Sequence, residues 1–147
     1  MKFDILNLNL LSPLYYVPAE KLEPFGCQEG IEGEKLFCFE LDEAQYGNIE
    51  PDKEKLFARL IFCGEAAEET TAESLGEAFF KLPQGKYLFS QKRELLNREL
   101  IIAMAIDIQQ EGLWQRLKPG RRLYLRYLFE DGKWVTQLFR PVQAVSA

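Results

Sequence analysis

The chain of 147 residues contains no histidine, the side chain that most often moves protons or binds metals near neutral pH. Histidine-based catalytic triads and the H-E-x-x-H zinc motif are therefore excluded. Cysteine is scarce too: Cys27, Cys38 and Cys63 are odd in number, and no two have C-x-x-C spacing. We expect reduced, mostly buried thiols, without a disulfide framework, a metal site or a bound cofactor.

Long apolar runs and a targeting signal are also missing. Although 47% of the residues are hydrophobic, no run approaches the roughly 20 residues that a membrane-spanning helix requires. Residues 1–5 lack the charged leader that precedes a long apolar segment in a secretory signal. These features predict a soluble cytoplasmic protein that does not bind membranes. The length predicts one domain over residues 1–147 with a single core.

Charge is distributed unevenly along the chain. Residues 1–77 carry 17 acidic and 6 basic side chains, whereas residues 78–147 carry 6 acidic and 12 basic ones. Charge runs of this kind are usually solvated surface; alternatively, the two segments attract each other, or a basic face binds an anion. The net charge of −5 and the lack of a recognition motif argue against direct binding to nucleic acid.

Periodicity predicts strands in the first half at residues 4–10, 35–41 and 56–63. Prolines and glycines interrupt the segment between the first two strands, so any helix there is short or irregular. We expect Gly64 to end the third strand. The glutamate-rich residues 65–77 predict a mobile or partly helical loop.

The second half has a clearer pattern. Residues 82–90 begin with a turn at Pro83 and Gly85 and continue as a strand. Apolar side chains at three- and four-residue steps over 95–108 predict a long helix that ends or breaks at Gly112, with one further turn over 113–117. Two strands follow at 121–129 and 134–142, joined by a turn at Asp131-Gly132. The predicted order is βαββ.

Two stretches carry a resemblance to a known family. Residues 82–87, Leu-Pro-Gln-Gly-Lys-Tyr, resemble the "lP-x-GkYa" entry of GyrI-like effector-binding domains, and residues 134–142 resemble the family's closing strand. Such domains are attached to MerR and AraC transcription regulators and also occur free-standing, as we expect here. The resemblance implies an α+β, SHS2- and SOUL-like fold. Two pseudo-symmetric βαββ halves, about 1–77 and 78–147, form antiparallel sheets with a ligand groove between them.

The strand at 121–129 departs from that family pattern. Family members that bind cationic drugs commonly carry a glutamate on this strand, and here it has none. Strand alternation predicts that one face packs beneath the helix, namely Leu123, Leu125, Tyr127 and Phe129. The other face, with Arg122, Tyr124, Arg126 and Leu128, would line the groove and favour an aromatic or anionic ligand. Alternatively, Arg122 and Arg126 pair with the acidic first half.

The candidate ligand-binding residues are all aromatic or basic: Tyr16, Tyr87, Phe89, Trp114, Arg122, Tyr124, Arg126 and Trp134. Core packing is the alternative role for each aromatic residue. Whether Tyr87 or Phe89 faces the groove depends on the strand register.

The leading hypothesis is a stand-alone small-molecule (effector) binding protein in transcription regulation or in drug or toxin sensing. One alternative is a protein-interaction module whose acidic first half binds a basic partner, as gyrase-binding relatives imply. Another is a small hydrolase, in which carboxylates such as Glu94 or Glu99 would be the remaining general bases. No catalytic residue is identified, and both a monomer and a homodimer fit the sequence.

Overall fold

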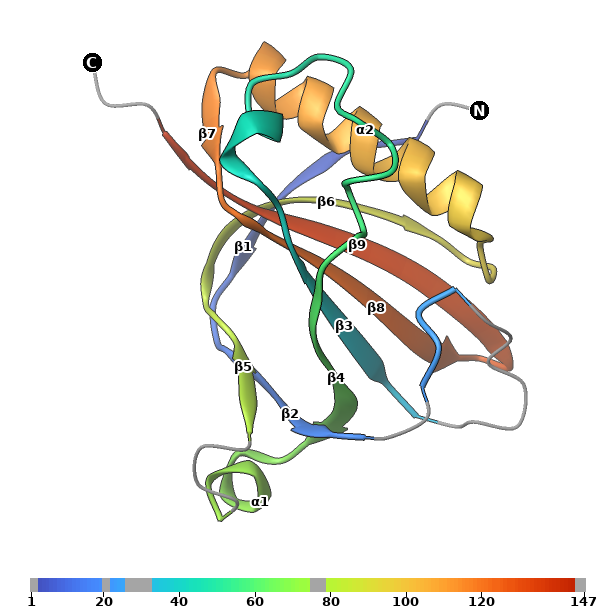
Figure 1. The fold of residues 1–147 in the computed structure, drawn as a ribbon. Helices are drawn as coiled ribbons and strands as arrows, with labels where there is room; N and C mark the ends of the chain where they lie inside the picture. The colour runs from blue at the N-terminus through green and yellow to red at the C-terminus, as the bar shows by residue number, and fades with distance from the viewer. Residues whose placement is uncertain (1–2, 20–21, 26–32, 75–78, 145–147) are drawn as a thin grey trace.

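The computed structural model describes residues 3–19, 22–25, 33–74 and 79–144, and strands dominate it (Figure 1). The helices are the 3-10 helix η1 (Glu43–Gln45), α1 (Glu69–Glu73) and α2 (Arg98–Trp114). The strands are β1 (Leu6–Leu10), β2 (Leu14–Pro18), β3 (Lys35–Glu40), β4 (Leu60–Ala67), β5 (Phe80–Leu82), β6 (Gly85–Lys92), β7 (Leu117–Pro119), β8 (Arg122–Glu130) and β9 (Lys133–Ala144).

All strand pairings are antiparallel, in the order β1-β6-β9-β8-β3-β4-β2-β5, with β7 paired to the end of β9. β1 and β2 follow each other closely and form one bent arm, and β5 and β6 form another. β1 pairs with β6 and β2 pairs with β5, so the two arms are hydrogen-bonded to each other along both of their strands. The sheet therefore curls strongly and has a concave and a convex face (Figure 1).

Helix α2 covers the convex face. Its Ile101, Met104 and Ile108 pack with strand residues such as Leu125 and Leu138 in one buried cluster. Asn97 caps the helix by accepting a hydrogen bond of 2.9 Å from the Leu100 amide. The helix thus begins later than the apolar pattern predicts. The larger of the two buried apolar clusters thus forms between α2 and the sheet.

The concave face holds a second buried cluster, and aromatic residues dominate it: Tyr16, Leu36, Cys38, Leu82, Tyr87, Tyr124 and Phe139. Strand β3 contributes to both clusters, with Phe37 and Phe39 on the convex face and Leu36 and Cys38 on the concave face. Both of its faces are buried, which explains why its sequence is almost continuously apolar rather than alternating.

The structure corrects the predictions for residues 51–77. Residues 51–59 form turns rather than the start of a strand, although Leu56 and Phe57 are buried. Phe57 packs edge-on against Phe39, with ring centroids 4.9 Å apart, so core packing explains its apolar character. Gly64 does not end the strand, because β4 continues to Ala67, and α1 follows.

The prediction for the second half is largely confirmed. β6, α2, β8 and β9 lie near the predicted positions, and the β8–β9 turn has positive φ at Asp131 (51°) and Gly132 (76°), as a type I′ hairpin requires. Two details are wrong. Gly112 lies inside α2, which continues only to Trp114, and the predicted extra turn over 113–117 is cut short because Arg116 (φ 58°) redirects the chain into β7.

The fold class is a helix-poor α+β arrangement in which an antiparallel sheet curls into a half-barrel. The predicted short helix between the first strands falls partly on residues 20–21 and 26–32, which lie outside the described residues, and residues 22–25 contain none. Among the helices described, none is long and apolar enough to cross a membrane.

The two described cysteines are free thiols, and Cys27 lies outside the described residues. Cys38 is fully buried on the concave face, and burial raises the pKa of its thiol to about 12. At pH 8 we therefore expect Cys38 to resist iodoacetamide in the native protein and to react fully in denaturant. Peptide mass spectrometry measures this difference. Complete native labelling of Cys38 within minutes would contradict its placement.

Candidate ligand-binding site

A pocket of about 790 Å³ lies at the end of the sheet where β6 and β8 begin and β9 ends. Residues 83–87, 118–122 and 141–144 supply most of its lining, together with Tyr124, Glu43 and Tyr46. Its size is that of a small-molecule site. The lining comes mainly from the second half of the chain, so this pocket is not a groove shared equally by the two halves.

Two tyrosines give the pocket an aromatic wall. The rings of Tyr87 and Tyr124 meet edge-on with centroids 6.2 Å apart, and both belong to the concave cluster. The Tyr87 hydroxyl donates to the Pro83 carbonyl at 2.5 Å. Burial raises the pKa of both tyrosines, so both hydroxyls stay protonated at neutral pH. Both side chains are almost fully buried, with 3% and 2% exposed, so they form an uncharged, aromatic base to the pocket.

The rest of the lining is strongly basic. It contains Lys86, Lys118, Arg121 and Arg122 but only one acid, Glu43. Arg121 donates to Glu40 at 3.1 Å, whereas the Arg122 guanidinium lies 5.6 Å from the ring of Phe80. Burial alone would lower the pKa of Arg122, but interactions with Tyr124, Cys38 and Glu40 raise it on balance. Arg122 is therefore a permanent positive charge beside the tyrosines.

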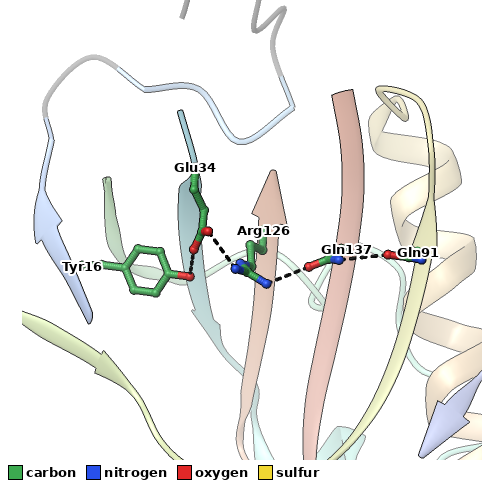
Figure 2. A network of polar contacts seen from close by, with 5 residues as sticks. All are labelled: Tyr16, Glu34, Gln91, Arg126 and Gln137. Carbon is green, nitrogen blue, oxygen red and sulfur yellow. Dashed lines mark hydrogen bonds and ion pairs between the residues drawn. The ribbon is translucent and has the colours of Figure 1, made fainter. Parts of the chain in front are cut away.

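A network of polar side chains crosses the concave face farther along the strands (Figure 2). Tyr16 donates its hydroxyl hydrogen to Glu34, and Arg126 donates to Glu34 at 2.7 Å. Arg126 also donates to Gln137 at 3.0 Å, and Gln137 donates to Gln91 at 2.9 Å. The network links β2, the residue before β3, β8, β9 and β6.

The network is mostly satisfied internally. Burial would lower the pKa of Arg126, but Glu34 and Tyr16 more than offset this and raise it. Burial is the main cause that raises the pKa of Tyr16. Arg126 Nε is buried and has no hydrogen-bond partner in the described part of the chain. We interpret this network mainly as a support that holds neighbouring strands in register.

Glu34 is the site residue that the sequence analysis missed. The sequence predicts no acid on the concave face, because the strand at 121–129 carries none. Glu34 directly precedes β3 and shares a face with Leu36 and Cys38, so extending their two-residue alternation backward would have found it. It also confirms, for Arg126, the predicted pairing of an arginine with the acidic first half.

The predicted division of β8 into two faces is confirmed in most positions. Leu123, Leu125 and Tyr127 lie in the cluster that α2 covers, and Tyr124 lies on the concave face. The prediction that Phe129 packs beneath the helix is wrong, because Phe129 is 47% exposed near the hairpin, beyond the core that α2 covers. The prediction that the register decides between Tyr87 and Phe89 is wrong, because residues two apart on one strand share a face. They are two residues apart on β6, and both contact the concave cluster.

Two predicted ligand residues lie elsewhere. Trp114 is 83% exposed at the end of α2. Trp134 packs on Phe129, with ring centroids 5.2 Å apart, and against the convex cluster. Trp134 shares its strand face with Leu138, whereas Phe139 faces the concave side. Of the predicted set, Tyr87, Arg122 and Tyr124 line the pocket, and Tyr16, Phe89 and Arg126 lie farther along the concave face.

The carboxylates that the interaction-module and hydrolase alternatives would use lie outside the pocket. Glu65 pairs with the buried Lys35 at 3.0 Å, and Glu69 accepts from Tyr15 at 3.2 Å. Glu94 and Glu99 are exposed near the start of α2, on the convex side. None of these four carboxylates lines the 790 Å³ pocket.

Comparison with protein-family models finds no match for this chain, and comparison with curated proteins finds none either. The pocket and its side chains are therefore the features that bear on function.

Proposed function

We propose that the protein is a stand-alone effector-binding protein of the GyrI-like class that takes an aromatic or anionic small molecule in the 790 Å³ pocket. The observation that carries the proposal is the lining, in which Tyr87 and Tyr124 lie beside four basic residues and a single acid. Few polar groups converging on an aromatic wall are typical of small-molecule sites.

The strand order supports two βαββ halves as part of this proposal. Each half has three strands: β2, β3 and β4 in the first half, and β6, β8 and β9 in the second. In both halves the third strand lies between the first and the second, in the orders β2-β4-β3 and β6-β9-β8. The two halves meet where β3 pairs with β8. A chain built from two related halves would have this order. In the second half α2 supplies the helix between the first and second strands.

In this proposal, ligand occupancy is the signal used in transcription regulation or in drug or toxin sensing in the cytoplasm. The interaction-module and hydrolase alternatives have less support. Glu65 and Glu69 already contact residues of this chain, and Glu34 is held by Tyr16 and Arg126. Glu94 and Glu99, the carboxylates of the hydrolase alternative, lie outside the pocket.

A ligand screen by thermal shift tests the proposal. We expect at least one class among drug-sized aromatic carboxylates, sulfonates and cations to bind. A ligand at 100 times its Kd stabilises by about 2.7 kcal/mol, which in a chain of this size raises the Tm by about 5 to 10 °C. Calorimetric titration then gives the Kd of each hit.

Pocket variants separate specific binding from general effects. Tyr124→Leu and Arg122→Gln should each weaken the hit at least tenfold, because each removes part of the lining. Trp114→Leu is the matched control, since this exposed aromatic residue lies outside the pocket. If every class fails to bind, or if both pocket variants bind as the wild type does, the proposal is wrong.

A further inference from the structure

Arg140, on β9, is a buried cation without a carboxylate partner in the described part of the chain. Its side chain is 2% exposed. Its Nε donates to the Gly120 carbonyl at 2.7 Å and its Nη1 to Gln109 at 3.3 Å, while its Nη2 has no partner among the described residues. Buried charges are normally paired, so this one requires an explanation.

Arg140 lies directly behind the wall of the pocket. Its guanidinium is 5.5 Å from the ring of Tyr46, and it binds the carbonyl of Gly120. Tyr46, Gly120 and the neighbouring Pro141 all line the pocket. Burial lowers the pKa of Arg140 to about 10, which still leaves it charged at neutral pH. Because charges are screened less inside a protein than in water, a cation in contact with lining residues favours an anion in the pocket.

The exposed side of the pocket adds charge of the same sign. Lys86 and Lys118 form no ion pair with any described residue, and Arg121 and Arg122 lie on the same rim. A concave site lined by one sign of charge concentrates ions of the opposite sign. Arg121 is paired with Glu40 at 3.1 Å, but Glu43 alone cannot balance Lys86, Lys118 and Arg122.

We propose that the ligand of this pocket is an organic anion, an aromatic carboxylate, sulfonate or phosphate. Its negative group lies against the end of β7 and the start of β8, between Lys118 and Arg122, with Arg140 as a buried positioning residue. This inference rests on the proposed function and narrows its ligand class. The aromatic part lies on Tyr87 and Tyr124, and lipophilic cations are repelled.

Two fluorescent probes that differ in charge test the inference. Anilinonaphthalene sulfonate is an anion, and phenylnaphthylamine is the same scaffold without the sulfonate. We expect the sulfonate to bind the native protein at least tenfold more tightly, and its Kd to rise with salt because surface lysines contribute. Near-UV circular dichroism verifies that each sample is folded, since the sulfonate also binds partly folded states.

Variants then assign the charges. Lys86→Gln with Lys118→Gln, both at exposed positions, should weaken sulfonate binding five- to tenfold and leave phenylnaphthylamine unchanged, whereas the exposed Lys133→Gln control should change neither. Arg140→Met should weaken only the sulfonate, and Arg140→Lys should restore part of the loss. A merely structural role for Arg140 would weaken both probes equally.

The outcomes separate this inference from the proposed function. Preference for the sulfonate that is lost in the lysine variant supports the inference. Equal binding of the two probes, weakened by Tyr124→Leu, overturns the anionic ligand class but leaves a small-molecule site. Failure of both probes together with the whole ligand screen overturns both.

Discussion

Gly64→Ala is expected to lower the free energy of unfolding by about 3 kcal/mol or more, because no space exists for a side chain there. A Cβ at this position would lie 2.2 Å from the Val17 carbonyl oxygen and 2.6 Å from the Phe62 ring. The phenyl ring can turn, but the carbonyl belongs to β2, which pairs with β4 over residues 15–18. Relieving the clash would separate these two strands.

Urea unfolding followed by circular dichroism measures this loss, with Gly47→Ala as the matched control. Nothing lies within 4 Å of a Cβ built on Gly47. Alanine there should change stability by less than about 1 kcal/mol, in the favourable direction if the backbone is compatible. Equal midpoints for the two variants would show that β2 and β4 are not packed as described.

Strand β8 was easier to predict from the sequence than β4. On β8, a polar or aromatic position follows each leucine, so alternation identifies both the strand and its two faces. On β4, a glycine at position 64 suggests the end of the strand when only the sequence is considered. In the structure Gly64 lies within the strand, where its missing side chain allows β2 to approach closely. Leu56 and Phe57 look like part of the same apolar run, but they fill the convex core from a turn.

The site was predictable only where it follows a single strand. Arg122, Tyr124 and Arg126 alternate on β8, so their common face follows from local geometry. The pocket, in contrast, joins the segments 83–86 and 118–121 to the end of β9, and only the pairing order of the strands brings these segments together. Arg140 resembles a surface residue in the sequence, because its burial depends on α2 and on residues 42–49.

The ion pair between Glu34 and Arg126 carries the second large expected effect. Both side chains are mostly buried, with 20% and 17% exposed, and their oxygen and nitrogen lie 2.7 Å apart. Glu34→Ala would leave Arg126 without its carboxylate and the Tyr16 hydroxyl without its acceptor. Removing one partner of such a pair costs about 3 kcal/mol, largely because the remaining charge stays buried. Arg126→Met should cost a similar amount.

The double variant distinguishes this pairing from two independent losses. Because it leaves no unpaired charge, Glu34→Ala with Arg126→Met should cost clearly less than the two single variants combined, which gives a coupling of about 2 kcal/mol in urea unfolding. Arg98 and Glu54 are the control pair: they are 44% and 84% exposed and 3.8 Å apart, so their coupling should not exceed about 0.5 kcal/mol. If the losses in free energy of unfolding from Glu34→Ala and Arg126→Met were additive, the polar network would not hold β8 to the start of β3.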